Sequence, residues 1–330
     1  MHMMKSPRFV QIYREDAAAI RNELLHGLTR LHAHVAPKYL YDPLGSRLFE
    51  AITELPEYYP TRTEAQIFAA HGQAMADALP RDATLIDLGA GNCNKAASLF
   101  DRFRAARYVA VDISVEFVRN ALECLQRQYP TLDMMGAGID FSAGLQLPQA
   151  LELDPHSPRL FFYPGSSIGN FTPDDALAFL RSVHASCGGI AGSGILIGVD
   201  LIKDTAALEA AYDDALGVTA AFNRNLLLHI NRLAGTDFAL ADWEHVAQYH
   251  AVLSRIEMHL KARRPVTVRW HDAQGPQARH FGQGETIHTE NSYKWLLPRF
   301  AQLLTDAGFA EPRHWCDPDQ RFAVFWARFS

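Results

Sequence analysis

The stretch Leu85-Ile86-Asp87-Leu88-Gly89-Ala90-Gly91-Asn92 decides the fold. A short apolar run enters a glycine turn, and residues 95–103 then carry the apolar spacing of a helix. A second apolar run, residues 108–112, ends in an acid 21 residues beyond Gly91. Open α/β sheets bind ligands in the loops at the carboxyl ends of their parallel strands. The pattern therefore predicts a nucleotide-binding α/β domain.

Strands and helices alternate around this loop. We expect strands at 84–88, 108–112, 160–163 and 194–200, and helices at 115–129 and 174–185. Because these strands are continuously apolar, they suit burial on both faces of a parallel, doubly wound sheet. Elsewhere we expect helices at 16–31, 64–79, 206–216, 218–233, 243–250 and 296–307, and strands at 254–260, 265–270 and 322–329. Thr61 or Thr63 is the expected cap of helix 64–79.

The composition is that of an ordinary globular protein. The 330 residues are 48% hydrophobic and 21% charged, with a formal net charge of −6. A chain without a dense basic run does not predict nucleic acid as its main partner. Four dispersed cysteines, and histidines without clustered metal-ligand spacing, predict reduced thiols and no metal site. No apolar run approaches the roughly 20 residues of a membrane span, and we expect a cytoplasmic protein.

The glycine loop offers specific chemistry to a nucleoside. Gly89 and Gly91 allow a ligand to lie against the main chain, and Asp112 can accept both hydroxyls of a ribose. Asp87 can attract a methionine amino group and a sulfonium. NAD binding favours a third glycine, which is absent here, so the loop is closer to that of a methyltransferase. A tight turn without a ligand is the remaining alternative.

Two further groups of polar residues lie at the ends of strands. The stretch Gly138-Ile139-Asp140-Phe141 looks like the end of another strand, and the second group follows strand 160–163. Asp140 beside Phe141 can hold an adenine, the acid accepting from the amino group and the ring stacking. The alternative is a surface turn followed by a core phenylalanine. Ser166, Ser167 and Asn170 follow strand 160–163, where they either face the reacting centre or cap the next helix.

Motifs outside the loop are longer and more specific. The longest is Leu55-Pro56-Glu57-Tyr58-Tyr59-Pro60-Thr61-Arg62-Thr63-Glu64. Others are Tyr39-Leu40-Tyr41-Asp42-Pro43-Leu44-Gly45-Ser46, Ser167-Ile168-Gly169-Asn170, Asp200-Leu201-Ile202-Lys203-Asp204, Ala211-Tyr212-Asp213-Asp214, Gly217-Val218-Thr219-Ala220 and Thr289-Glu290-Asn291-Ser292. Together these stretches resemble the histidine Nα-methyltransferase family of ergothioneine biosynthesis, from about Tyr39 to the C-terminus.

The resemblance implies an architecture of two domains. One is a doubly wound, Rossmann-like class I methyltransferase domain at residues 63–201 plus 294–330. The other is a mainly helical α+β domain that binds an amino acid, at residues 15–62 plus 202–293. The shift in pattern after Asp200 agrees with this division. The resemblance also implies that the amino-acid pocket lies between the domains.

The resemblance also implies roles for individual residues. Contacts with S-adenosylmethionine would come from Tyr41, Gly89, Lys95, Asp112, Asp140 and Phe141, in addition to Asp87 and Gly91 of the loop. The substrate would be held by Tyr58, Asn170, Tyr212, Thr219, Glu290 and Ser292. Asn170 and Tyr212 can donate to the carboxylate of histidine, and Glu290 and Ser292 can bond its imidazole nitrogens. Asn291, Tyr293 and Trp295 are bulkier than is usual in the family and are expected to reshape the pocket.

The implied reaction is methyl transfer from S-adenosylmethionine to the α-amine of L-histidine, with S-adenosylhomocysteine as the second product. Three transfers would give hercynine. Tyr41 would orient the amine, and positioning would be the main catalytic device. We expect a monomer that acts on a small molecule. The alternatives are the same chemistry on another amino acid such as a tryptophan derivative, an NAD-dependent oxidoreductase, and a binding protein without turnover.

Overall fold

The computed structural model describes residues 5–13, 16–113, 115–141 and 144–330, and divides the chain into two compact units. Unit 1 comprises Met1–Arg14, Arg62–Leu201 and Trp295–Ser330. Unit 2 comprises Glu15–Thr61 and Ile202–Lys294. Each unit is therefore assembled from segments that are far apart in the sequence.

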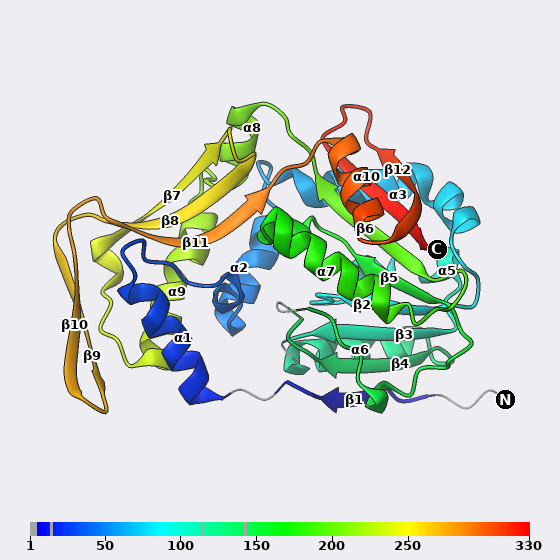
Figure 1. Ribbon diagram of the computed structural model, residues 1–330, viewed down its shortest axis with the longest axis horizontal. Helices are drawn as coiled ribbons and strands as arrows, with labels where there is room; N and C mark the ends of the chain where they lie inside the picture. The colour runs from blue at the N-terminus through cyan, green and yellow to red at the C-terminus, as the bar shows by residue number, and fades with distance from the viewer. Residues whose placement is uncertain (1–4, 14–15, 114, 142–143) are drawn as a thin grey trace. The chain divides into compact units, whose positions relative to one another are not determined.

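Unit 1 is built on one mixed sheet (Figure 1) with the strand order β1-β4-β3-β2-β5-β6-β13-β12. The strands are β1 (Arg8–Gln11), β2 (Thr84–Leu88), β3 (Arg107–Asp112), β4 (Asp133–Gly138), β5 (Arg159–Tyr163), β6 (Gly194–Asp200), β12 (Phe309–Cys316) and β13 (Phe322–Phe329). The pairs from β1 to β6 are parallel, whereas β13 lies antiparallel to β6 and to β12. The order reverses at β2, so its carboxyl end lies at the topological switch point.

Helices cover both faces of this sheet. They are α3 (Tyr59–Ala78), α4 (Asn94–Ala97), α5 (Phe100–Phe103), α6 (Val115–Gln128), α7 (Pro173–Ser186) and α10 (Leu297–Asp306), with short 3-10 turns η2 (Gln149–Leu151) and η3 (Ser167–Asn170). Side chains of α3, α4, α5 and α6 share one core with the sheet. On the other face, Phe300 of α10 packs on Phe325 and Phe179 of α7 packs on Tyr163. Every residue of β2 and β6 is buried, as continuous apolar strands require.

Unit 2 combines helices with antiparallel strands. Its helices are α1 (Ala17–Thr29), α2 (Pro43–Thr53), α8 (Thr205–Ala210) and α9 (Val218–Ala234), with short turns η1 (Pro37–Leu40) and η4 (Leu240–Asp242). Strands β7 (Trp243–His250), β8 (Arg255–Ala262) and β11 (Thr286–Tyr293) form one sheet in the order β11-β8-β7. Strands β9 (Val266–Asp272) and β10 (Gly275–Phe281) form a separate hairpin. Side chains of α1, α2, α9 and the three-stranded sheet share one apolar core.

The motif Tyr41-Asp42-Pro43-Leu44-Gly45 is a helix start. Asp42 caps α2 by accepting from the Gly45 N–H at 2.8 Å, and Pro43 occupies the first turn, where no N–H is needed. Asp42 is buried and also accepts from Asn225 of α9 at 2.6 Å. The cap therefore joins α2 to α9 and fixes the backbone beside Tyr41.

Most expected elements are confirmed, and the differences have physical causes. Helix α3 begins at Tyr59, not after a threonine cap, because Pro60 fits its first turn. Residues 95–103 form two short helices, α4 and α5, and the helix expected at 206–216 ends at Ala210. The helix expected at 243–250 is wrong: these residues are strand β7, paired along its whole length with β8. No strand was expected at β1, β10, β11 or β12.

The tight approach at Gly45 gives a first prediction. An ideal Cβ at Gly45 would lie 1.8 Å from the backbone oxygen of Leu40. We expect Gly45→Ala to destabilise the protein by about 1–3 kcal/mol, because a backbone atom must shift to make room. The matched control is Gly282→Ala in the same unit, where the nearest atom is 3.9 Å away. Equal melting temperatures of the two variants in thermal unfolding would contradict the prediction.

Candidate functional site

The glycine loop after β2 is held in one conformation by backbone hydrogen bonds. Gly89 and Gly91 have φ of +71° and +53°, which glycine adopts without strain. The N–H groups of Gly89 and Ala90 donate to the carbonyl of Val111 at 2.8 and 3.0 Å, and the Gly91 N–H donates to Asp112 Oδ2 at 2.9 Å. The loop is therefore tied to the end of β3, and Asp112 lies against it.

Space around the loop suits a ligand that lies on the main chain. An ideal Cβ on Gly91 would meet no atom within 4 Å, and one on Gly89 would meet only the ring of Phe141, at 4.0 Å. Phe141 and Asp140 follow β4, the neighbour of β3 in the sheet. The structure thus brings together Gly89, Asp112 and Phe141, three of the expected cofactor residues.

Asp87 points into the protein beneath this loop. Its side chain is buried and accepts a hydrogen bond from the Tyr108 hydroxyl at 2.7 Å. Burial raises the pKa of Asp87 to about 7, although the Tyr108 bond opposes the shift. Asp87 therefore supports the loop through Tyr108 on β3.

Lys95 is bound to the buried carboxylate of Glu64, for which no role was expected from the sequence. Its Nζ lies 2.7 Å from Glu64 Oε2, and Glu64 is only 1% exposed. The other oxygen of Glu64 accepts from the Gly165 N–H at 2.8 Å. Glu64 thus joins α3, α4 and the loop after β5. Glu64 is the last residue of the Leu55–Glu64 motif, and membership of this motif is the sequence feature that could have indicated its role.

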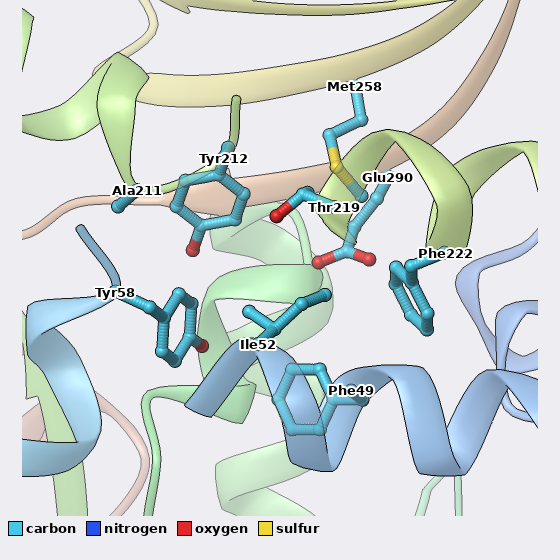
Figure 2. Close-up of a pocket in the computed structure, with 9 residues that line it drawn as sticks. All are labelled: Phe49, Ile52, Tyr58, Ala211, Tyr212, Thr219, Phe222, Met258 and Glu290. Atoms are coloured by element: carbon cyan, nitrogen blue, oxygen red, sulfur yellow. The ribbon is translucent and has the colours of Figure 1, made fainter. Parts of the chain in front are cut away.

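Unit 2 contains a small cavity lined mainly by aromatic and apolar side chains (Figure 2). Its volume is about 20 Å³, which is room for about one water molecule. The lining residues are Phe49, Ile52, Tyr58, Ala211, Tyr212, Thr219, Phe222, Met258 and Glu290. Four of the expected substrate residues, Tyr58, Tyr212, Thr219 and Glu290, therefore meet here. A substrate ring can enter only if lining side chains move.

Glu290 is the charged group of this cavity. It is 7% exposed, and its Oε2 is buried without a hydrogen-bond partner among the described residues. Burial raises the pKa of Glu290 to about 7, and the positive charge of Lys294 opposes the shift. Figure 2 shows the carboxylate directed into the space between Thr219 and Phe222. An unpartnered buried oxygen is costly, so this carboxylate is poised to accept a donor from a ligand.

Three buried polar side chains form a network next to Glu290. The Tyr212 hydroxyl donates to Ser292 Oγ at 2.7 Å. Lys294 Nζ donates to Ser292 Oγ at 2.8 Å and to the Tyr212 hydroxyl at 3.0 Å. His245 fixes the backbone of Tyr212: Asn223 donates to its Nδ1, so its Nε2 donates to the Tyr212 carbonyl at 2.8 Å. Tyr212 and Ser292 are expected substrate residues, whereas no sequence motif indicated Lys294.

Tyr41 and Asn170 complete the expected set in different units. Tyr41 belongs to unit 2, where its ring packs at 5.5 Å from both Phe49 and Phe222. Those two rings also line the cavity, so Tyr41 extends its aromatic wall. Asn170 belongs to unit 1, at the end of η3 after β5.

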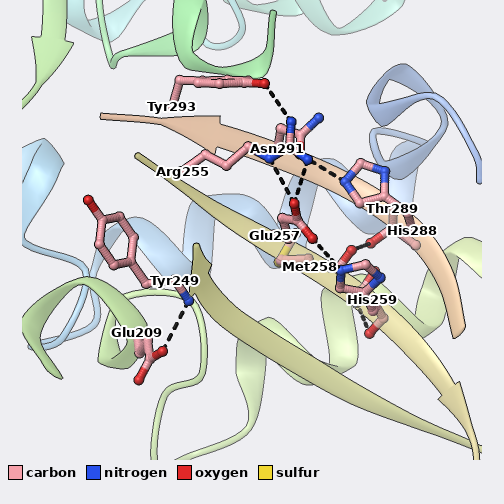
Figure 3. Close-up of polar contacts among 11 residues, drawn as sticks. Glu209, Tyr249, Arg255, Glu257, Met258, His259, His288, Thr289, Asn291 and Tyr293 are labelled. Atoms are coloured by element: carbon pink, nitrogen blue, oxygen red, sulfur yellow. Dashed lines mark hydrogen bonds and ion pairs between the residues drawn. The ribbon is translucent and has the colours of Figure 1, made fainter. Parts of the chain in front are cut away.

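The opposite face of β11 carries a separate polar cluster (Figure 3). Arg255 bonds Glu257 and the Tyr293 hydroxyl, both at 2.5 Å, while His288 Nε2 lies 2.9 Å from Asn291 Oδ1. Neither Asn291 nor Tyr293 is among the described residues that line the cavity. Strand alternation turns them away from Glu290 and Ser292. Trp295 packs on Phe300 in unit 1.

Other kinds of site find no support among the residues that the structure describes. No group of three or more His, Cys, Asp or Glu side chains there is arranged to hold a metal ion. Nor is any helix in that part of the chain both long and apolar enough to cross a membrane.

The parallel sheet with its antiparallel β13, and the glycine loop at the switch point, define a class I methyltransferase. A family model described as histidine-specific methyltransferase, SAM-dependent, matches residues 20–329. The chain belongs to this family of histidine-specific, S-adenosylmethionine-dependent methyltransferases.

Three curated relatives agree with the family assignment. The chain is 38% identical to the histidine N-alpha-methyltransferase of Mycolicibacterium smegmatis, over 93% of this chain and 94% of the relative. It is 37% identical to the protein of the same name from Mycobacterium tuberculosis, over 94% and 95% of the two chains. Ergothioneine biosynthesis protein 1 of Schizosaccharomyces pombe is 31% identical over 82% of this chain, which corresponds to 35% of that longer protein.

The raised pKa of Glu290 predicts a pH-dependent penalty on stability. Between its ordinary value of 4.5 and about 7, the folded protein keeps a proton that the unfolded chain has lost. Stability from this group therefore falls as pH rises through that window and stays low above it. We expect Glu290→Gln to raise the melting temperature at pH 8.5, corresponding to at most about 3 kcal/mol, and to change it far less at pH 5.

Thermal unfolding of the ligand-free protein at both pH values measures this difference. The control Glu54→Gln removes a carboxylate from an exposed position of the same unit. A Glu290→Gln variant whose stability relative to wild type is the same at pH 5 and pH 8.5 would show that the carboxylate titrates normally.

Proposed function

We propose that this enzyme transfers three methyl groups from S-adenosylmethionine to the α-amine of L-histidine, giving hercynine for ergothioneine biosynthesis. The observation that carries the proposal is the unpartnered, buried Oε2 of Glu290 beside an apolar cavity. A carboxylate there accepts an imidazole N–H, and a ring without that donor would leave it unpaired. Family membership supports the same substrate.

In this proposal unit 1 holds the cofactor. In unit 1, Gly89 and Gly91 leave the main chain open, Asp112 takes the ribose hydroxyls, and Phe141 with Asp140 takes the adenine. Asp87 stabilises the loop through its hydrogen bond with Tyr108, and Lys95 does so through its ion pair with Glu64. Bound S-adenosylmethionine supplies an electrophilic methyl group.

The substrate contacts are assigned to the residues around the cavity of unit 2. Glu290 and Ser292 bond the two imidazole nitrogens, and Tyr58 contacts the ring. Thr219 and, from unit 1, Asn170 donate to the α-carboxylate. Tyr212 lies beside it, with its hydroxyl donating to Ser292 Oγ.

In the proposed reaction, the main catalytic contribution of the protein is to position the α-amine for attack on the methyl group. The α-amine must lose a proton before each attack, and Tyr41 orients it while water accepts the proton. Tyrosine faces tolerate the methylated cation, because a cation–π contact is worth about 0.5–2 kcal/mol. We extend the proposal to a cytoplasmic monomer that takes a free amino acid and needs neither metal nor nucleic acid.

The first test is mass spectrometry of purified protein incubated with S-adenosylmethionine and L-histidine. We expect a product three methyl groups heavier than histidine, and little product from tryptophan, tyrosine or phenylalanine in parallel reactions. A methylated tryptophan with unchanged histidine would move the substrate to an indole. Binding of NADH, without affinity for S-adenosylhomocysteine, would replace the methyltransferase by an oxidoreductase.

The cofactor assignment rests most directly on Asp112. Asp112→Asn keeps the shape but removes the charge, so we expect affinity for S-adenosylhomocysteine to fall about 10- to 100-fold in calorimetry. The control Asp101→Asn alters an exposed acid in the same unit. Equal affinities in the two variants would remove Asp112 from the cofactor site.

A further inference from the structure

Lys294 is a buried cation that contacts two of the proposed substrate residues. It is 3% exposed and follows directly after β11. Its Nζ donates to both Ser292 Oγ and the Tyr212 hydroxyl, and lies 4.6 Å from the centre of the Tyr212 ring. None of the roles proposed above uses this side chain.

The ammonium restricts what the two hydroxyls can offer. A lysine ammonium has three donors and no acceptor, so both hydroxyl oxygens must accept from it. The two hydroxyls are also 2.7 Å apart, so one of them donates to the other. The pair holds two hydroxyl hydrogens, and only one is used between them. The Tyr212 hydrogen is used in the bond to Ser292, so the Ser292 hydrogen is directed outside this network of three residues.

Lys294 also acts on the charge of Glu290. Its positive charge favours the ionised carboxylate, whereas burial disfavours it. The other titratable side chains lining the cavity are Tyr58 and Tyr212. The polar side chains on this side of β11 follow one another as the carboxylate of Glu290, the hydroxyl of Ser292 and, directly after the strand, the ammonium of Lys294.

We propose that Lys294 is a positioning residue for substrate recognition: it fixes Tyr212 as a donor to Ser292 and Ser292 as a donor to the ligand, and it keeps Glu290 an acceptor. The inference rests on the proposed function and adds a residue to that site. The site then offers one acceptor and one donor, which matches a neutral imidazole with one N–H and one bare nitrogen. A ring with an N–H alone, such as an indole, leaves the donor unmatched.

The test compares Lys294→Met with wild type in two measurements. Calorimetry with S-adenosylhomocysteine present gives the dissociation constant of L-histidine between pH 6.5 and 9, and initial rates give kcat and KM. We expect Lys294→Met to weaken histidine binding about tenfold or more, to raise KM more than it lowers kcat, and to shift the rise of affinity with pH to higher pH. Lys294→Arg should restore part of the affinity and the pH profile.

A double-mutant cycle separates positioning from a general loss of structure. If Lys294 acts through Ser292, adding Ser292→Ala to Lys294→Met should cost much less than it costs in wild type. The control Lys261→Met removes an ion-paired cation at the surface of the same unit and should leave histidine affinity unchanged. Additive effects of the two substitutions, or an unchanged dissociation constant and pH profile in Lys294→Met, would overturn the inference.

Two further outcomes are a Lys294→Met variant that does not fold and a wild-type protein that does not bind L-histidine. If Lys294→Met does not fold, Lys294→Arg and Lys294→Gln decide: affinity should fall in the order Lys, Arg, Gln, and equal affinities would overturn the inference. A wild-type protein that binds S-adenosylhomocysteine but no L-histidine would reject the proposed substrate, and this inference with it. A normal wild-type response with an unaffected Lys294→Met variant rejects the inference alone.

Discussion

The buried carboxylate of Glu64 is the point at which four segments of unit 1 meet. A charge that is 1% exposed requires donors, and Lys95 of α4 and the Gly165 N–H supply them. The absence of a side chain at Gly198 of β6 leaves room for it, since an ideal Cβ there would lie 2.2 Å from Glu64 Oε1. This interaction fixes the loop after β5, and with it the segment that ends at Asn170.

Glu290 is a second buried glutamate, but it lacks a hydrogen-bond donor for one of its oxygens among the described residues. Both carboxylates are buried, but Glu64 has a cation and a backbone donor, whereas Oε2 of Glu290 has no partner among the described residues. The first arrangement stabilises one loop geometry. The second raises the pKa to about 7 and leaves an oxygen that a donor from a ligand can satisfy. The contrast distinguishes a structural glutamate from one available to a ligand.

Sequence patterns predicted the parallel sheet of unit 1 well because strands buried on both faces are continuously apolar. They failed at β7, where the inward positions are Trp243, His245, Ala247 and Tyr249. A polar His245 faces inward because Asn223 and the Tyr212 carbonyl satisfy its nitrogens, and Val246 faces outward. The two-residue alternation was therefore hidden, and the apolar spacing of Trp243, Val246 and Ala247 resembled a helix.

The same reasoning explains why the candidate site was only partly predictable. Glycines and an acid at strand ends predict a ligand loop, so Gly89, Gly91 and Asp112 could be proposed from local spacing. Lys294 requires the knowledge that residues 286–293 form a strand, and their mixed polar sequence gave no such signal. Once the strand is known, its two-residue period places Glu290, Ser292 and Lys294 on one face. Lys294, two residues beyond Ser292, therefore continues the pattern that Glu290 and Ser292 begin. Those two residues belong to the Thr289–Ser292 motif, and Lys294 lies outside it.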